Sequence, residues 1–226
     1  MIHRVTWLAA AVLTPLYVSA QPKLTAAEIL QRVHENYSNP SEFYFSWTTT
    51  ATIVFPSGAV QTSAVRNRAA RKGERYLWSQ LEPEAPKASL SWIDDGTAMW
   101  TYYPGRRQLV KQALDDQLLA VLKLTIQRSL GAFEEISGDA HSGHAELLRP
   151  AEITAGGKRR ACYVVRVDMP NQDSVNTLWI DASKFVIWRE EETHPGSQDR
   201  SVLEWEEAIV NEAIPAAVFQ PPRAAQ

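Results

Sequence analysis

The sequence predicts a mainly β protein of the α+β class, in which one curved antiparallel sheet is covered by helices. Three observations lead to this fold class. Apolar and polar residues alternate with a period of two over many short runs, Gly, Pro and Asp residues mark turns between those runs, and a helical period appears in only two stretches. A length of 226 residues is normal for one β-rich domain, and no internal repeat or linker divides the sequence. We therefore expect one folded domain over residues 21–226.

Residues 1–20 have the pattern of a secretory signal peptide. A short positive end precedes a mostly apolar run from Val5 to Val18, and small residues around Ala20 fit a cleavage site. The run is about 14 residues long, which is shorter than the roughly 20 residues that cross a bilayer. The one Cys, Cys162, is far from the cleavage site, so neither a lipid anchor nor an internal disulfide is expected. We expect the mature protein to be soluble, periplasmic and monomeric.

The folded part is expected to begin with a helix that starts near Leu24. Thr25 and Glu28 have the spacing of a capping box, in which each side chain accepts a hydrogen bond from the other residue's backbone N–H. Ile29, Leu30, Val33 and Tyr37 form an apolar stripe of helical period. The Asn-Pro pair at 39–40 is expected to end the helix.

A long strand is expected next, from Glu42 to Phe55, with one apolar and one polar face. Short turns then separate a series of further strands. They are expected at Val60–Arg71, Glu74–Leu81, Ser89–Ile93, Thr97–Tyr103 and Arg107–Lys111.

A second helix is expected from Asp115 to Leu130, where Gly131 can stop it and the polar segment Ser137–His144 can form a loop. Five more strands follow in the sequence. They are expected at Ala145–Thr154, Arg160–Met169, Val175–Asp181, Phe185–Glu192 and Ser201–Val210. Because the apolar face of a sheet must be covered, the two amphipathic helices are its expected covers.

Several aromatic-rich pieces follow the first helix and strand in a definite order. They are Trp92-Ile93-Asp94-Asp95-Gly96, Trp100-Thr101-Tyr102-Tyr103-Pro104, Thr177-Leu178-Trp179-Ile180-Asp181, Phe185-Val186-Ile187-Trp188-Arg189, and Ile214-Pro215 with Phe219-Gln220-Pro221-Pro222. This order resembles the LolA-like family of outer-membrane lipoprotein-sorting proteins, over about Leu24 to Pro222. The resemblance implies an incomplete β-barrel with helices as a lid over its concave face, and a periplasmic carrier that holds acyl chains inside.

The resemblance also implies partners. The cargo would be the acyl chains of a lipoprotein or lipid, taken from an inner-membrane donor protein and moved, in the manner of a chaperone, to an outer-membrane acceptor. A cavity-facing arginine holds the lid in such carriers, and Arg66, Arg68 and Arg75 are the open choices here.

Aromatic and aliphatic residues of the strands and of the second helix are the candidates for the lining of a lipid cavity. The alternation within a strand shows which residues share a face but not which face is concave. The sheet-side candidates are Phe43, Phe45, Trp47, Ile53, Trp92, Trp100 and Tyr102, and the lid-side candidates are Leu118, Leu119 and Leu122.

We expect no enzymatic activity, no catalytic residue, no metal site and no cofactor. His141 and His144 lie in a Gly-containing loop without a nearby Cys or carboxylate to complete a metal site. Asp94 and Asp95 precede a glycine, as is ordinary in a hairpin turn. Cys162 is expected to be a buried, inert thiol.

A net charge of −3 gives no reason to expect a nucleic-acid partner. Two other functions stay open besides the carrier. One is a lipid- or lipoprotein-sensing module of an envelope regulatory system, and the other is a structural envelope protein without a ligand.

Overall fold

The computed structural model describes residues 24–38, 40–82, 89–139, 144–169 and 172–222. The expected signal peptide and His141 lie outside these residues. The helices are α1 (Ala26–Ser38) and α2 (Asp116–Asp139), with the short 3₁₀ helices η1 (Pro104–Arg106) and η3 (Ala216–Phe219). The strands are β1 (Glu42–Val54), β2 (Val60–Lys72), β3 (Arg75–Leu81), β4 (Leu90–Asp94), β5 (Ala98–Tyr103), β6 (Gln108–Ala113), β7 (Ala145–Leu147), β8 (Ala151–Ala155), β9 (Lys158–Met169), β10 (Ser174–Asp181), β11 (Ile187–Thr193) and β12 (Arg200–Val210).

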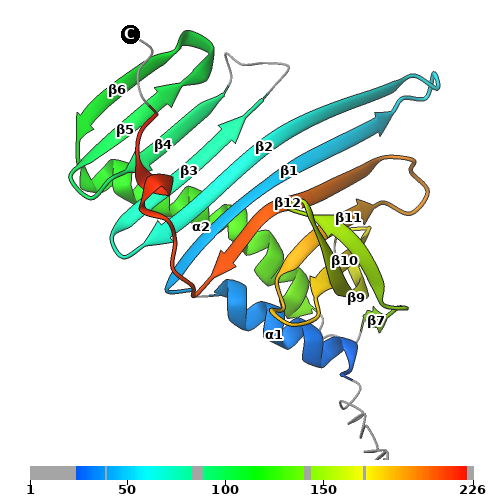
Figure 1. Cartoon of the computed structure of the whole chain (residues 1–226). Coiled ribbons are helices and arrows are strands. Elements are labelled where there is room, and N and C mark those ends of the chain that lie inside the picture. The colour runs from blue at the N-terminus through cyan, green and yellow to red at the C-terminus, as the bar shows by residue number, and fades with distance from the viewer. Residues whose placement is uncertain (1–23, 39, 83–88, 140–143, 170–171, 223–226) are drawn as a thin grey trace, which may run out of the picture.

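All twelve strands belong to one antiparallel sheet, in the order β6-β5-β4-β3-β2-β1-β12-β11-β10-β9-β7, with β8 paired to the start of β9. In the described part of the chain the two ends of this order do not pair, so the sheet is not closed into a barrel. Both α-helices lie against one face of the sheet, which we call the helix-covered face (Figure 1). The predicted fold class, mainly β with one unclosed antiparallel sheet and two helices, is confirmed.

The first helix begins and ends as the sequence predicts. The Thr25 N–H donates to Glu28 Oε2 over 2.8 Å, and the Glu28 N–H donates to Thr25 Oγ1 over 3.2 Å, so the capping box is confirmed. The helix ends at Ser38, two residues before Pro40.

Two expected boundaries were wrong. The strand expected over 145–154 is divided into β7 and β8, because Pro150 has no N–H to donate to a neighbouring strand. The second helix does not stop at Gly131 but continues to Asp139, through part of the segment expected to be a loop. A glycine inside a helix lowers helix stability by only about 1 kcal/mol relative to alanine. The residues on either side of Gly131 can offset this loss, so the helix continues.

Aromatic side chains of β1 form much of the core between the sheet and α1. The Phe45 ring stacks on Tyr37 of α1 at 5.1 Å between centroids and on Phe43 at 5.5 Å. Phe45 is fully buried, as are Leu30 of α1 and Val165 of β9. Burial of each such side chain stabilises the fold by about 1.5–3 kcal/mol, so this packing fixes α1 against the sheet.

The opposite face of the sheet is partly covered by the C-terminal segment. Ile214 and Phe219 are each 2% exposed and pack with Tyr44, Leu77 and Ile93. The red segment that crosses β3 and β4 in Figure 1 contains η3 and these two residues. Each face of the sheet therefore has its own cover, helical on one side and the C-terminal segment on the other.

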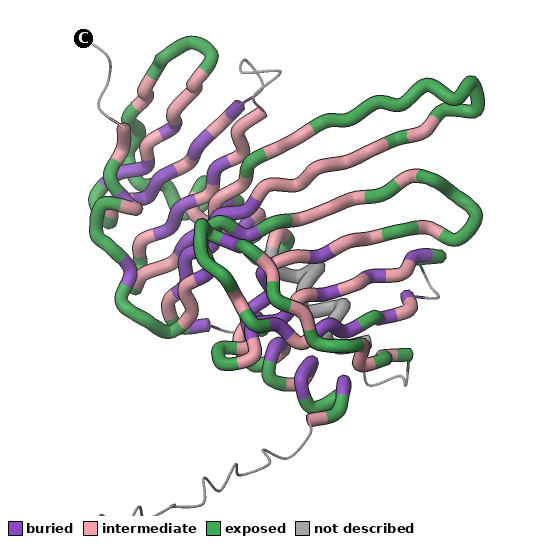
Figure 2. Tube along the Cα trace, turned by 45° about the vertical axis from the view of Figure 1, so that its right-hand side comes forward, coloured by how far each residue is buried: buried purple, intermediate pink, exposed green. Residues whose placement is uncertain are grey.

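The β1–β2 hairpin extends beyond the rest of the molecule and is exposed toward its tip (Figure 2). Ile53, Phe55 and Val60 near this tip have 45%, 43% and 63% of their surface exposed. No helix among the described residues is long and apolar enough to cross a membrane.

Candidate functional site

The sequence-predicted lining residues are divided between the two faces of the sheet. Phe43, Phe45 and Trp47 are buried on the helix-covered face, and Trp92 is half-buried there. Phe45 and Trp92 belong to one cross-strand row, because Phe45 pairs with Ala69, Ala69 with Trp78 and Trp78 with Trp92. The register therefore brings these candidates to one side of the sheet.

Trp100 and Tyr102 lie on the opposite face. Trp100 packs against the cluster that contains Phe219, and its indole N–H donates to Asp95 Oδ2 over 2.7 Å. On β5 it is Met99 and Thr101 that point toward the helices. Ile53, near the hairpin tip, is also remote from the helices, so neither it nor the two β5 aromatics belongs to the site that follows.

The three lid-side candidates have different surroundings on α2. Leu122 is 1% exposed and faces the core, and Leu119 is half-buried against the same core. Leu118 is 38% exposed. It lies at the edge of the interface between α2 and the sheet.

A small apolar hollow lies at this edge. Its volume is about 30 Å³, and it is lined by Trp92, Met99 and Thr101 from the sheet, Gln112 from β6, and Leu118 and Val121 from α2. This space holds about one water molecule. Met99, Thr101 and Val121 were missed by the sequence reasoning, although Thr101 pairs with Trp92 and Val121 is one helical turn from Leu118.

The hollow continues outward as a stripe of exposed apolar side chains. Leu114, Leu118, Val121 and Leu124 are between 38% and 47% exposed. Their spacing places them along one side of the first half of α2 and just before it. An amphipathic helix normally turns such a stripe toward the core, so α2 has a second apolar side without a protein cover among the described residues. We call these four residues the α2 stripe.

The three arginines considered from the sequence lie on the face of the sheet opposite α2. Arg66 forms an ion pair with Glu206 at 3.1 Å, Arg68 lines a pocket on the opposite face, and Arg75 lies over Phe219. Arg71 instead pairs with Tyr76 across β2 and β3, on the helix-covered face. Lys123 of α2 lies 4.9 Å from the centre of the same Tyr76 ring, so α2 contacts the sheet here through a cation and an aromatic ring.

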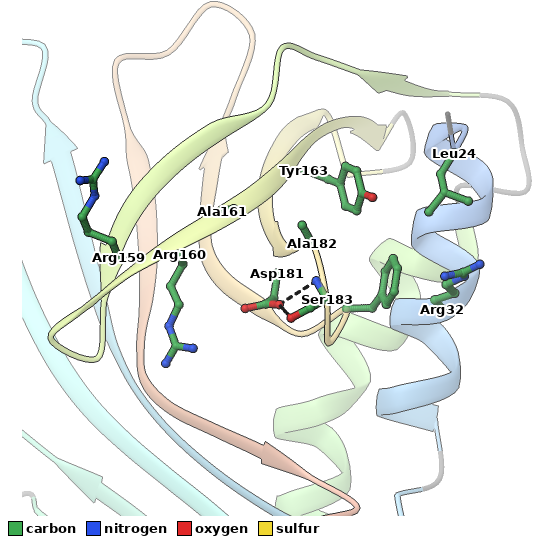
Figure 3. Close-up of a pocket in the computed structure, with 10 residues that line it drawn as sticks. Leu24, Arg32, Arg159, Arg160, Ala161, Tyr163, Asp181, Ala182 and Ser183 are labelled. Atoms are coloured by element: carbon green, nitrogen blue, oxygen red, sulfur yellow. Dashed lines mark hydrogen bonds between the residues drawn. The ribbon is translucent and has the colours of Figure 1, made fainter. Parts of the chain in front are cut away.

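A second hollow, of about 710 Å³, opens between α1, β9 and the turn after β10 (Figure 3). Arg32 lies over the Phe185 ring at 4.7 Å, and Arg160 lies over Trp188 at 4.1 Å. Asp181 accepts hydrogen bonds from the N–H and hydroxyl of Ser183. None of the predicted lining residues is in this wall, and its charged groups make it unsuitable for an acyl chain.

One buried acid lies on β11. Glu190 is 5% exposed, and its Oε2 has no hydrogen-bond partner. Burial, with a smaller contribution from Glu192, raises the pKa of Glu190 to about 8. The carboxyl group is therefore mostly neutral at pH 7, in keeping with its apolar neighbours Leu178 and Leu203 across the strands.

Cys162 and Asp95, which were considered for catalysis, are respectively buried in the core and held by hydrogen bonds within a turn. Cys162 is 2% exposed, and burial raises the pKa of its thiol to about 11. Burial favours the neutral form of Asp95, but hydrogen bonds from Thr97 and Trp100 outweigh it and lower its pKa to about 2. Among the described residues, no group of three or more His, Cys, Asp or Glu side chains could hold a metal ion.

No protein-family model matches this sequence, and no curated protein sequence matches it. Among solved structures, the MucA/MucB complex of Pseudomonas aeruginosa is 17% identical with a TM-score of 0.44, over 89% of this chain and 62% of that chain. A LolA superfamily protein from Nitrosomonas europaea is 16% identical with a TM-score of 0.29, over 88% and 99% of the two chains. A DUF1329 family protein from Desulfovibrio piger is 10% identical with a TM-score of 0.31, over 86% and 95%.

This chain spans less than two thirds of the length of the MucB structures that it resembles. A protein of the LolA superfamily is among the solved structures to which this chain is similar.

Proposed function

We propose that this protein is a non-enzymatic carrier of the bacterial envelope, which binds an acyl chain of a lipid or lipoprotein between α2 and strands β4 to β6. The observation that supports this most is the continuity between the hollow lined by Trp92, Met99 and Leu118 and the exposed α2 stripe. Together they offer an apolar surface that begins in solvent and leads under the helix.

The energetics favour an apolar guest at this surface. Burying a large apolar side chain stabilises a protein by about 1.5–3 kcal/mol, so four half-exposed ones leave several kcal/mol of hydrophobic stabilisation unused. An acyl chain gains roughly 0.8 kcal/mol for each CH₂ group that leaves water. An acyl chain laid along the α2 stripe would remove both apolar surfaces from water.

Binding requires α2 to move. The hollow of about 30 Å³ has room for about one water molecule, so an acyl chain enters only when the first half of α2 separates from β4 and β5. Beyond this half, Ile126 is 5% exposed and α2 packs against α1, which would hold the rest of the helix in place. The first half of α2 is thus proposed to be the lid and the second half its anchor.

A carrier of this kind needs no chemical step. The acyl chain exchanges between a membrane, the protein and an acceptor, and its surroundings are apolar before and after each transfer. The proposed route starts at an inner-membrane donor and ends at an outer-membrane acceptor. The protein would travel between them through the periplasm, to which the expected signal peptide would export it.

A titration with a fluorescent fatty-acid analogue tests the proposal. We expect saturable binding with a change in Trp emission, because Trp92 lines the hollow. The double variant Leu118→Asp/Val121→Asp places charges in the path of the acyl chain and is expected to weaken binding by about tenfold or more.

Gln127→Asp is the matched control, since Gln127 is an exposed residue of the same helix outside the α2 stripe. The affinity of this variant for the fatty-acid analogue should stay within about twofold of the affinity of the unmodified protein. Equal affinities of the double variant and the control would contradict the proposed site. A folded protein that binds no acyl analogue, and that yields no acyl lipid on solvent extraction, would favour the structural protein instead.

A sensing module is the second candidate function. The observation that favours it is the apolar tip of the projecting β1–β2 hairpin, where Phe55 and Val60 are exposed. MucB, one of the similar proteins, forms a complex with MucA. Phe55→Ser/Val60→Ser should abolish capture of a partner protein by a sensor and leave the acyl titration of a carrier unchanged.

A further inference from the structure

A row of polar residues, three of them serines, crosses the sheet on the face opposite the helices. Ser46 pairs with Arg68, Arg68 with Ser79, Ser79 with Ser91 and Ser91 with Tyr102. Directly paired residues point to the same face of a sheet, so these five side chains form a continuous line across five strands. The three serines are 1%, 3% and 7% exposed, and the hydroxyls of Ser79 and Ser91 are 2.8 Å apart.

An apolar row runs beside it. It is formed by Tyr44, Ala70, Leu77, Ile93 and Trp100, which pair in the same way from β1 to β5. Ile214 and Phe219 of the C-terminal segment pack on this second row. The segment is held there by Lys72, whose ammonium group donates to the Ile214 carbonyl over 2.7 Å, and by Arg75, whose guanidinium lies 5.4 Å from the Phe219 ring centre.

The C-terminal segment forms one wall of a pocket of about 240 Å³ above the two rows. Small serine side chains leave this space between the sheet and residues 217–222. Apolar walls come from Leu77, Leu81, Ile93 and Val218, and polar groups come from Arg68, Ser79, Ser91 and the two tyrosines, Tyr44 and Tyr102. A largely apolar wall with a few polar groups is typical of small-molecule sites.

Arg68 is the one cationic side chain in this wall among the described residues. Its Nε is buried and has no hydrogen-bond partner, and no described carboxylate forms an ion pair with it. A buried donor without a partner is unfavourable, so an acceptor placed in the pocket would gain a charge-assisted hydrogen bond. Arg66, two residues earlier on the same strand, is already paired with Glu206.

We propose that this pocket binds a small monocarboxylate with a short apolar tail, such as a short-chain fatty acid. The planar guanidinium of Arg68 receives the carboxylate, and the tail lies against Leu77, Ile93 and Val218. A single cation matches a monoanion, whereas a phosphate dianion would bring a second, uncompensated charge next to the apolar wall of the pocket. The site is separate from the acyl site, because the sheet lies between them.

Isothermal titration of the purified protein with hexanoate tests this assignment. We expect one saturable site, with hexanol and inorganic phosphate binding at least about tenfold more weakly, because hexanol lacks the charge and phosphate lacks the tail. Arg68→Gln should weaken hexanoate binding by about tenfold or more, and Arg66→Gln, the same charge change on the same strand and face, should stay within about twofold.

The Leu118→Asp/Val121→Asp variant should bind hexanoate as the unmodified protein does, which separates this site from the proposed acyl site. If Arg68→Gln does not fold, Arg68→Lys, which keeps the charge but not the planar fork, is expected to show a smaller but measurable loss. Equal losses in the Arg66 and Arg68 variants, phosphate binding as tight as hexanoate, or no saturable hexanoate binding would each overturn the proposal.

Discussion

At the scale of single residues, two hairpin turns use an aspartate in the same way. Asp95 Oδ1 accepts from the Thr97 and Ala98 N–H groups, and Asp95 Oδ2 accepts from the Trp100 indole. Asp181 likewise caps its own turn through Oδ1 and accepts from the Trp188 indole through Oδ2 over 2.9 Å. One carboxylate in each case fixes both a turn and the orientation of a tryptophan.

Asp95→Asn should therefore destabilise the protein by about 1–2 kcal/mol, because the amide keeps only one acceptor oxygen. The pKa of Asp95 is lowered to about 2 in the folded state, against an ordinary value of 3.8. Its contribution is then present above about pH 4 and is lost as the pH falls toward 2. Urea unfolding at pH 7 and pH 2.5 measures this, and a variant as stable as the parent at pH 7 would contradict the role.

Glu190 is expected to have the opposite pH dependence. Its pKa is raised to about 8 in the folded state, from an ordinary 4.5. The unfolded chain releases this proton at a lower pH than the folded one, so folding becomes less favourable as the pH rises from about 4.5 to 8. Because a glutamine side chain has no proton to release, the Glu190→Gln variant should not lose stability in this pH range.

Relative to the parent, the Glu190→Gln variant should gain on the order of 1–4 kcal/mol between pH 5 and pH 8. Denaturant unfolding at the two pH values is the measurement. Parallel pH profiles of variant and parent would show that Glu190 is ionised in the folded protein.

At the scale of elements, β1 combines a buried first half with a half-buried second half that leads to the exposed hairpin tip. Phe45 is fully buried, whereas Phe55, which follows β1 by one residue, is 43% exposed. Apolar and polar residues alternate along the whole strand, so the sequence does not distinguish its two halves. Alternation shows which residues share a face of a strand, but it does not show where the covering helix ends.

Two substitutions test the difference in burial between Phe45 and Phe55. Phe45→Ala should destabilise the protein by about 3–5 kcal/mol, as is typical of a buried phenylalanine. Phe55→Ala should change the free energy of unfolding by no more than about 0.5 kcal/mol. If chemical denaturation gave similar decreases in the free energy of unfolding for the two variants, the hairpin tip would be buried in solution.

The sequence predicted most elements but not how their faces combine. The capping box of Thr25 and Glu28 was recognisable because it is local. Trp100 and Phe45 were both expected to line one cavity, but they lie on opposite faces, since the relation between β1 and β5 depends on the register of three intervening strands. The continuation of α2 past Gly131 and the pocket around Arg68 also depend on tertiary packing that no local pattern reports.

At the scale of the whole molecule, the sheet separates two apolar layers. The layer between the sheet and the helices is mostly filled by side chains, and its hollow beneath α2 has a volume of about 30 Å³. A large apolar chamber beneath α2, as the resemblance implied, is therefore not open in this conformation of the described residues, and the hollow of about 710 Å³ beside α1 has charged groups in its wall. The carrier proposal depends on movement of the first half of α2.

Amide hydrogen exchange, measured by mass spectrometry with and without palmitate, tests this movement most directly. The proposed lid movement predicts that palmitate slows exchange in residues 116–126 of α2 and in β4 and β5, because the bound acyl chain would join the lid to the sheet. Unchanged exchange in these segments at a palmitate concentration that saturates the protein, or protection confined to other elements, would contradict it.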